Sequence, residues 1–217
     1  MGHAIEGLAA GRGHTVVCTV DNEAEWGAKA EALGSADVAI EFTTPATAVA
    51  NIRRCFGLGL PVVCGTTGWD ADLDAVAAQC RAGGHALFTA SNFSLGMNIM
   101  FELNERLATL MRGRDSYRVD IVETHHIHKL DAPSGTALTL ARQIAAATDR
   151  PLDAIPIESV RQGEVPGTHT VTYRSDIDTL SLTHEAHSRQ GLALGALLAA
   201  EFLVGRQGHF TMKDLLH

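Results

Sequence analysis

Residues 2–90 alternate between helical runs and short apolar or β-branched runs, and this alternation constrains the fold more than any other feature. Strands that are separated by helices pair in parallel, because each helix carries the chain back across a face of the sheet. The pattern therefore predicts an α/β fold in which helices cover both faces of a parallel sheet. The predicted strands are residues 15–20, 38–42, 61–64 and 86–90, and the predicted helices are residues 2–10, 24–33, 46–56 and 70–81.

The pattern changes after residue 92. Three strand-like segments follow one another without helices, which predicts a mixed or antiparallel sheet whose open face becomes an interface. We expect a parallel-sheet domain of residues 1–93 and 189–217, and an α+β domain of residues 94–188. The strands expected in this part are residues 117–123, 157–161, 169–173 and 179–184, and the helices are residues 97–111, 134–147 and 189–204, followed by a tail at 210–216.

Charge and composition exclude several classes of partner. The chain has 17 Lys and Arg against 25 Asp and Glu, a formal net charge of -8, so nucleic acid is not expected to bind. Four separated cysteines without a C-x-x-C pair predict reduced thiols and a cytoplasmic location. The longest apolar stretch, residues 191–204, contains Glu201, which predicts a buried helix and no membrane span. No targeting segment is expected.

The densest group of chemically able side chains lies between residues 123 and 137. Ser134 is predicted to cap the helix that follows, which leaves the backbone N–H groups of Gly135 and Thr136 without partners inside the helix. These groups, with the partial positive charge of the helix N-terminus, suit a carboxylate or a phosphate. The segment is therefore a candidate anion site.

The same segment carries three histidines and a lysine within five residues. His125 offers a proton donor that titrates near neutral pH, and Lys129 offers a fixed positive charge. This pair is suited to protonating and neutralising an anionic intermediate. Zinc binding by His126 and His128 is the competing interpretation, but the sequence shows no obvious set of further ligands, so no metal is expected.

The first domain gives a weaker indication of a dinucleotide. Asp21 ends a predicted strand 19 positions after Gly2, close to the offset at which dinucleotide folds place an acid on the ribose hydroxyls. Loops at residues 42–45, 65–68 and 90–93 follow predicted parallel strands, and ligands of open α/β sheets bind at that edge. Each loop is equally well explained as an ordinary turn, because Gly, Thr and Asn are common in turns.

The segment Val122 to Ala137, VETHHIHKLDAPSGTA, resembles the motif of the 4-hydroxy-tetrahydrodipicolinate reductase family, nicotinamide-dependent enzymes of lysine and diaminopimelate biosynthesis. The resemblance implies a Rossmann-like first domain that binds the dinucleotide, and a second domain that binds substrate and builds a homotetramer. Further segments similar to the family stand in its order from Gly2 onward: EFTTP (41–45), VCGTTG (63–68), ASNFSLGMN (90–98), Arg161, Gly163, GTH (167–169) and HEAHSR (184–189).

The resemblance also implies an activity and residue roles. The implied reaction reduces 4-hydroxy-tetrahydrodipicolinate to tetrahydrodipicolinate, as a hydride passes from NAD(P)H to ring carbon 4 and the hydroxyl leaves as water. His125 corresponds to the catalytic acid/base and Lys129 to the catalytic cation. The residues predicted to bind the small dicarboxylate substrate are His126, Ser134, Gly135 and Thr136. Those predicted to bind the nucleotide, from the resemblance and the loops above, are Gly2, Asp21, Phe42, Gly65, Thr66, Thr67, Ala90, Ser91, Asn92 and Phe93.

The chain departs from the family pattern at its start. Family members begin with a β-strand and a G-x-x-G-x-M-G loop, of which Met1 and Gly2 alone are present, so the first domain is expected to be N-terminally truncated. Loss of a central strand exposes backbone groups and apolar helix faces, and exceeds the roughly 5 to 15 kcal/mol by which domains are stable. We expect this chain to be aggregation-prone or catalytically impaired, and a form extended upstream to be active.

The residues after Asp21 favour NADH. The segment NEAE (22–25) contains no Lys or Arg to bind a 2′-phosphate, and Glu23 and Glu25 would repel one. NADH is therefore the predicted cofactor, with NADPH as the alternative.

Three other functions stay open on the sequence alone. The first is an NAD-dependent oxidoreductase that acts on another small dicarboxylate. The second is a non-catalytic protein that binds a dicarboxylate or a nucleotide. The third is a zinc hydrolase built on the histidine cluster, which predicts bound metal and inhibition by a chelator.

Overall fold

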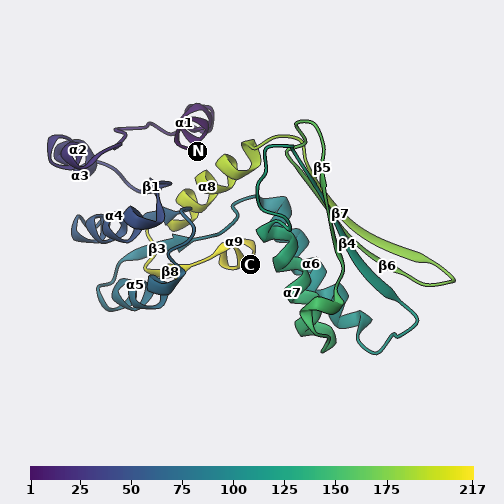
Figure 1. Ribbon diagram of the computed structural model, residues 1–217. Coiled ribbons are helices and arrows are strands. Elements are labelled where there is room, and N and C mark those ends of the chain that lie inside the picture. The colour runs from purple at the N-terminus through teal and green to yellow at the C-terminus, as the bar shows by residue number, and fades with distance from the viewer. The chain divides into compact units, whose positions relative to one another are not determined.

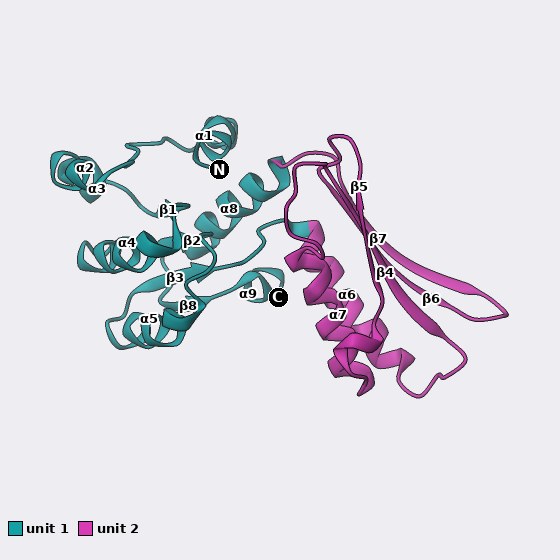
Figure 2. Ribbon diagram, in the orientation of Figure 1, with its two compact units in different colours: residues 1–95, 190–217 teal, residues 96–189 magenta.

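The computed structural model (Figure 1) describes every residue from Met1 to His217. The chain divides into two compact units (Figure 2). Unit 1 comprises Met1–Leu95 and Gln190–His217, and unit 2 comprises Gly96–Arg189. No helix is both long enough and apolar enough to cross a membrane.

Unit 1 is built on a parallel sheet with the strand order β1-β2-β3-β8. Val62, Val63 and Leu87 are fully buried, because both faces of this sheet are covered by helices. The side chains of adjacent strand residues point to opposite faces, so a short apolar run suffices to fill both. The strands are β1 (Ala39–Glu41), β2 (Val62–Cys64), β3 (Ala86–Thr89) and β8 (Gly208–Phe210).

The two faces of the unit 1 sheet have separate apolar cores. Helices α4 and α5 pack over Val62 and Leu87, whereas α1 and α8 pack over Val63 and Phe88. Helices α1 and α8 lie side by side (Figure 1), although they are far apart in the sequence. The helices are α1 (Gly2–Ala9), α2 (Glu23–Ala28), α3 (Ala30–Gly34), α4 (Pro45–Gly57), α5 (Asp70–Ala82), α8 (Gln190–Leu203) and α9 (Met212–Leu216), with a 3-10 turn η1 (Ala10–Arg12).

Residues 15–20 do not form a strand, so this prediction is wrong. The segment has no strand partner in either sheet, and Val16 and Val17 are exposed. A β-branched run becomes a strand only where a neighbouring strand receives its hydrogen bonds, and none lies beside this one. The predicted helix 24–33 is also divided into two, at Lys29, whose side chain reaches back to the carbonyl of the extended segment.

Unit 2 is built on a mixed sheet with the order β5-β4-β6-β7. Strands β4 and β5 are parallel, whereas β4 pairs with β6, and β6 with β7, in antiparallel fashion. Helices α6 and α7 cover one face, and residues such as Met100, Ile121 and Leu140 form the core between them. The elements are α6 (Leu95–Met111), β4 (Arg118–His125), α7 (Gly135–Thr148), η2 (Leu152–Ala154), β5 (Ile157–Arg161), β6 (Gly167–Arg174) and β7 (Thr179–Ala186).

The two units together confirm the predicted fold class, an α/β protein with a Rossmann-like parallel sheet and a second domain with a mixed sheet. One face of the second sheet is open. Helices cover the other face, which carries the apolar side chains of β4 and β6. Threonines such as Thr170 and Thr183 lie on the open face, where their hydroxyl oxygens are 3.1 Å apart.

Candidate active site

The buried face of β4 changes from apolar to polar along the strand. Val119 and Ile121 belong to the apolar core, and Glu123 and His125 continue the same face toward the carboxyl end. Residues at i and i+2 of a strand share a face, so the core pattern itself carries these two side chains inward. The Glu123 side chain is fully buried and that of His125 is 9% exposed.

Strand register brings two further residues to this polar end. His169 on β6 lies opposite Glu123, and Arg161 on β5 lies beside His125. The rings of His125 and His169 meet edge to face, with centroids 5.0 Å apart. His125 Nδ1 is 2.6 Å from Glu123 Oε2, and an Arg161 Nη2–H group donates to Glu123 Oε1 over 3.0 Å. Two histidines, a carboxylate and a guanidinium thus form one buried cluster.

The charges in this cluster set the protonation of its members. Burial alone would raise the pKa of Glu123, but hydrogen bonds from Ser134 and Arg161 outweigh it and lower the pKa to about 2. Burial lowers the pKa of His125, and the Glu123 carboxylate opposes that lowering. Burial also lowers the pKa of His169, to about 4. At neutral pH the cluster therefore holds an ionised Glu123 and a neutral His169, and the Glu123 carboxylate favours the protonated form of His125.

The second ring nitrogen of His125 faces Gly167. A Cβ at Gly167 would stand 3.0 Å from His125 Nε2, so the glycine keeps this side of the ring clear. Because Nδ1 lies 2.6 Å from the Glu123 carboxylate, Nε2 is the nitrogen that is left for a ligand. His125 therefore has the arrangement of a general acid, with one nitrogen held and the other open.

The N-terminus of α7 lies beside this cluster. The predicted cap is present, since Ser134 Oγ accepts a 3.2 Å hydrogen bond from the Ala137 N–H group. The Ser134 N–H group donates to Glu123 Oε1 over 3.2 Å, and Ser134 Oγ lies 3.3 Å from His169 Nε2. Gly135 is exposed, and a Cβ there would meet nothing within 4 Å. The first N–H groups of the helix thus lie at the surface and suit an anion, and the Asp131 carboxylate already lies near that of Gly135.

The loop between β4 and α7 carries the remaining predicted groups. Lys129 stands between His125 and Ser134 in the sequence, and its ammonium group donates hydrogen bonds to both carboxylate oxygens of Asp131. The His126 ring is partly buried and its Nδ1 atom is buried without a hydrogen-bond partner. Of the predicted residues in unit 2, the structure therefore joins His125 and Ser134 through the buried carboxylate and places Lys129 on the adjoining loop.

One group of side chains has the composition of a metal site. Ligand atoms of Glu123, His125 and His169 all lie within 4.8 Å of one another. The carboxylate already accepts from Arg161, however, and a guanidinium at 3.0 Å opposes a cation at that position. The donor set thus fits a hydrogen-bonded acid/base cluster better than a metal centre. The zinc ligands considered from sequence, His126 and His128, belong to no group of three ligands in the structure.

The predicted nucleotide residues of unit 1 gather mainly at the carboxyl edge of its sheet. Phe42 and Gly65 follow β1 and β2, and a Cβ on Gly65 would meet the Phe42 ring at 2.1 Å. The Phe42 and Phe93 rings are 5.6 Å apart, and Thr66 Oγ1 accepts from the Thr43 N–H group over 2.7 Å. The loops after β1, β2 and β3, which include Thr67, Ala90, Ser91 and Asn92, therefore form one edge, the position at which open α/β sheets bind ligands.

Gly2 and Asp21 are not part of these three loops. Gly2 begins α1, and a Cβ there would meet nothing within 4 Å. Asp21 lies just before α2, and its carboxylate is exposed and forms no hydrogen bond or ion pair. The two acids that follow it are paired: Glu25 with Lys29 at 2.9 Å, and Glu23 with Arg54. The positive charges of Lys29 and Arg54 therefore lie beside this segment, although residues 22–25 themselves contain no Lys or Arg.

Fold and site together define an α/β protein of two units, one with a ligand edge on a parallel sheet, the other with an acid/base histidine beside an anion-binding helix N-terminus. Comparison with known proteins agrees. Residues 1–93 match the family model described as "Dihydrodipicolinate reductase, N-terminus", and residues 96–216 match "Dihydrodipicolinate reductase, C-terminus". The chain belongs to the dihydrodipicolinate reductase family.

Individual relatives support the same assignment. The 4-hydroxy-tetrahydrodipicolinate reductase of Christiangramia forsetii is 47% identical over 225 residues, which cover 100% of this chain and 93% of the relative. The enzyme of that name from Methanopyrus kandleri is 40% identical, over 83% of this chain and 71% of its own. A solved structure, dipicolinate-bound dihydrodipicolinate reductase from Paenisporosarcina sp. TG-14, has a TM-score of 0.70 and 25% identity, covering 81% of this chain and 71% of that one.

Proposed function

We propose that this chain reduces 4-hydroxy-tetrahydrodipicolinate to tetrahydrodipicolinate with a nicotinamide nucleotide, and that unit 1 binds the nucleotide and unit 2 the substrate. The observation that carries the proposal is the buried His125, which has one free ring nitrogen, next to the open N-terminus of α7. The shared name of the similar enzymes supports this reaction, and dipicolinate in the similar solved structure supports a ring dicarboxylate as ligand.

The substrate carboxylates have matching groups in unit 2. The N–H groups of Gly135 and Thr136, at the start of α7, would donate hydrogen bonds to one carboxylate. The Ser134 hydroxyl does not compete for these two groups, because it accepts from the Ala137 N–H group. Lys129 and His126 on the preceding loop would bind the other polar groups of the ring. These contacts would orient the ring with its reacting carbon next to His125.

His125 would supply the proton of the reaction. In the net reaction the ring loses a hydroxide and gains a hydride, and the hydroxide takes up one proton to leave as water, so one proton must be provided by an acid that is then recharged from solvent. His125 Nε2 is free for this purpose because Glu123 holds Nδ1. Lys129, as a fixed cation, would stabilise negative charge that develops in the ring.

The loops of unit 1 are suited to a dinucleotide. The backbone N–H group of Thr67 donates no hydrogen bond to a backbone carbonyl, so the carboxyl edge of the sheet offers a free donor for phosphate. Phe42, Gly65 and the loop from Ala90 to Phe93 would complete the binding surface. A bound nicotinamide nucleotide supplies the hydride for the reduction.

NADH is proposed as the preferred nucleotide. Glu23 and Glu25 are each paired with a cation, and neither Arg54 nor Lys29 is left free to bind a 2′-phosphate. The carboxylate of Asp21 is unpaired, so its negative charge would accept ribose hydroxyls and repel a phosphate.

A homotetramer in the cytoplasm is proposed for the assembled enzyme. The open face of the unit 2 sheet and the exposed side chains of Leu180 and Ile177 offer a surface for a second copy. All four cysteines are free thiols, which fits a reducing compartment. Light scattering coupled to size-exclusion chromatography would measure the mass, and a monomer at micromolar concentration would contradict the tetramer.

The proposed function is tested by following the absorbance of reduced nicotinamide with enzymatically generated 4-hydroxy-tetrahydrodipicolinate. We expect substrate-dependent oxidation, faster with NADH than with NADPH, and a loss of about 10²- to 10⁴-fold in His125→Ala. His128→Ala is the matched control, because His128 is exposed, pairs with Glu164 and makes only a tilted ring contact with His126, at 5.9 Å between centroids. The assay is run on this chain and on a form extended upstream, and folded protein of both forms that oxidises neither nucleotide contradicts the proposal.

A further inference from the structure

Glu123 is a fully buried residue, and the two oxygens of its carboxylate contact different groups. Its Oε2 atom is 2.6 Å from His125 Nδ1. Its Oε1 atom accepts hydrogen bonds from the Ser134 N–H group and from Arg161 Nη2, over 3.2 and 3.0 Å. One side chain thus contacts both the proposed acid and the cap of the anion-binding helix.

Arg161 extends these contacts to the loop that carries Lys129. Its Nη2 atom donates to the Asp131 carbonyl over 2.6 Å as well as to Glu123, and its Nε atom donates to the Lys129 carbonyl over 3.3 Å. The guanidinium is a rigid fork, so these bonds fix the loop backbone relative to the carboxylate. The loop has no strand or helix of its own between His125 and α7.

We propose that Glu123 and Arg161 form a positioning pair that sets the protonation and aim of His125 and the position of the Lys129 loop. The inference rests on the proposed function, which gives His125 its role as the acid and Lys129 its role as the cation. A buried ion pair contributes little to stability compared with apolar side chains of the same size, so stability alone does not explain it. Its contacts instead reach the three parts of the proposed site: the acid, the cation loop and the helix N-terminus.

The carboxylate has a predictable effect on the acid. Burial lowers the pKa of His125, the positive charges of Lys129 and Arg161 lower it further, and the Glu123 charge counteracts these effects. Replacing Glu123 by Gln keeps the shape and removes the charge, so the pKa of His125 should fall further. An acid must be protonated to act, so the fall in activity at high pH should move to lower pH.

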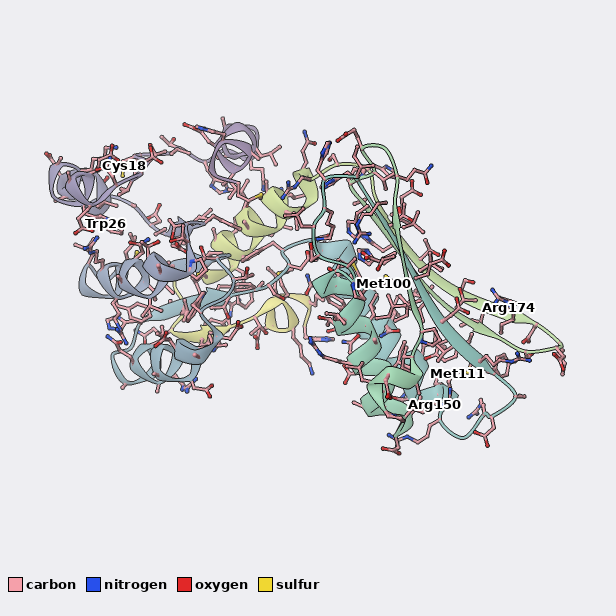
Figure 3. All side chains as sticks on the ribbon, viewed as in Figure 1. Cys18, Trp26, Met100, Met111, Arg150 and Arg174 are labelled. Atoms are coloured by element: carbon pink, nitrogen blue, oxygen red, sulfur yellow. The ribbon has the colours of Figure 1, made fainter.

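The test compares Glu123→Gln with Asp120→Asn. Asp120 is on the same strand, and it pairs with Arg174 at 3.7 Å with both side chains substantially exposed. Arg174 is labelled in Figure 3 and lies at the end of β6 away from the site. We expect kcat to fall about 10- to 100-fold in Glu123→Gln, a part of the 10²- to 10⁴-fold acid contribution, with its alkaline limit at lower pH. Asp120→Asn should match the wild type in both.

The role of Arg161 in the pair is tested by Arg161→Lys, with Arg174→Lys as the control. A lysine keeps the charge beside Glu123 but cannot make the forked bonds to two carbonyls. We expect KM for the dicarboxylate to rise and kcat to fall, because the Lys129 loop loses its anchor, whereas Arg174→Lys should change neither. Unchanged kinetics and unchanged pH limits in both Glu123→Gln and Arg161→Lys overturn the inference.

Nuclear magnetic resonance separates this inference from the proposed function. Titration of the His125 ring protons in wild type and Glu123→Gln needs no turnover, so it reports on the pair even if the chain reduces no substrate. A lower His125 pKa in the variant supports the inference, and an equal pKa overturns it. If Glu123→Gln fails to fold, Arg161→Lys and the milder Glu123→Asp carry the same comparison, with an intermediate shift expected for Asp.

Discussion

The Lys129 ammonium contacts both oxygens of the Asp131 carboxylate, at 2.7 and 3.0 Å. The hydrogen bond from Lys129 lowers the pKa of Asp131, so this carboxylate is ionised at neutral pH. The proposed substrate is itself a dicarboxylate, and it would require the same ammonium. Asp131 therefore competes with the substrate for Lys129 within the loop.

Removal of this competitor should strengthen dicarboxylate binding. For Asp131→Asn we expect dipicolinate to bind about 2- to 5-fold more tightly, because exposed pairs contribute about 0.2–1 kcal/mol. Isothermal titration calorimetry measures the change. The same substitution in a Lys129→Met background should give no gain, since the ammonium is absent. Weaker binding in Asp131→Asn would mean that Asp131 supports the loop and does not compete.

His169 should make stability depend on pH in a defined range. Burial holds the pKa of His169 at about 4, against 6.5 when exposed. Between these values the unfolded chain binds a proton that the folded chain does not, so stability falls as pH falls from 6.5 to 4. The contribution between pH 7 and 4.5 is about 2 kcal/mol.

Urea unfolding of wild type and His169→Asn at pH 7 and 4.5 checks this. The variant should lose less stability than the wild type over that interval. His3→Asn is the control, because His3 is fully exposed and should leave the pH dependence unchanged. Parallel pH dependence in wild type and His169→Asn contradicts the prediction.

Local patterns in the sequence were enough for most of the fold, and where they failed the missing information was long-range. Apolar runs predicted β2 and β3, which are buried on both faces. Residues 15–20 have a similar β-branched composition but form no strand, since strand formation depends on a partner that the run itself does not specify. The helix at Gly135 was predictable because its cap, Ser134, is adjacent in sequence.

The candidate site divides in the same way. His125, Lys129 and Ser134 occupy one continuous segment, so their chemistry is visible without a structure. No local pattern assigns Arg161 a role, because it meets Glu123 from 38 positions away through the register of β4 and β5. A usable signal was present in β4, where Glu123 and His125 continue the alternation of Ile121 and so had to point inward.

Gly195 should be required for the packing of α8 against the loop that follows β3. A Cβ at this position would stand 1.7 Å from the Phe93 carbonyl oxygen, and a backbone atom cannot move aside cheaply. Gly195→Ala is expected to destabilise the chain by about 1–3 kcal/mol. Gly191→Ala, in the same helix but with its nearest neighbour at 3.8 Å, should cause no loss, since Ala is the better helix former. Equal urea midpoints for the two variants would refute the close approach.

The unpaired carboxylate of Asp21 should govern the choice between NADH and NADPH. Glu23 and Glu25 are neutralised by Arg54 and Lys29, so Asp21 is the acid that keeps its full charge in this segment. Asp21→Asn is expected to reduce the ratio of kcat/KM for NADH to that for NADPH by about 10-fold, because repulsion of a 2′-phosphate is removed and an acceptor for the ribose is weakened. Asp37→Asn, an exposed change at the opposite end of β1, should leave the ratio unchanged. A wild-type ratio near one would contradict the proposed NADH preference, and an unaltered ratio in Asp21→Asn would assign the discrimination to other residues.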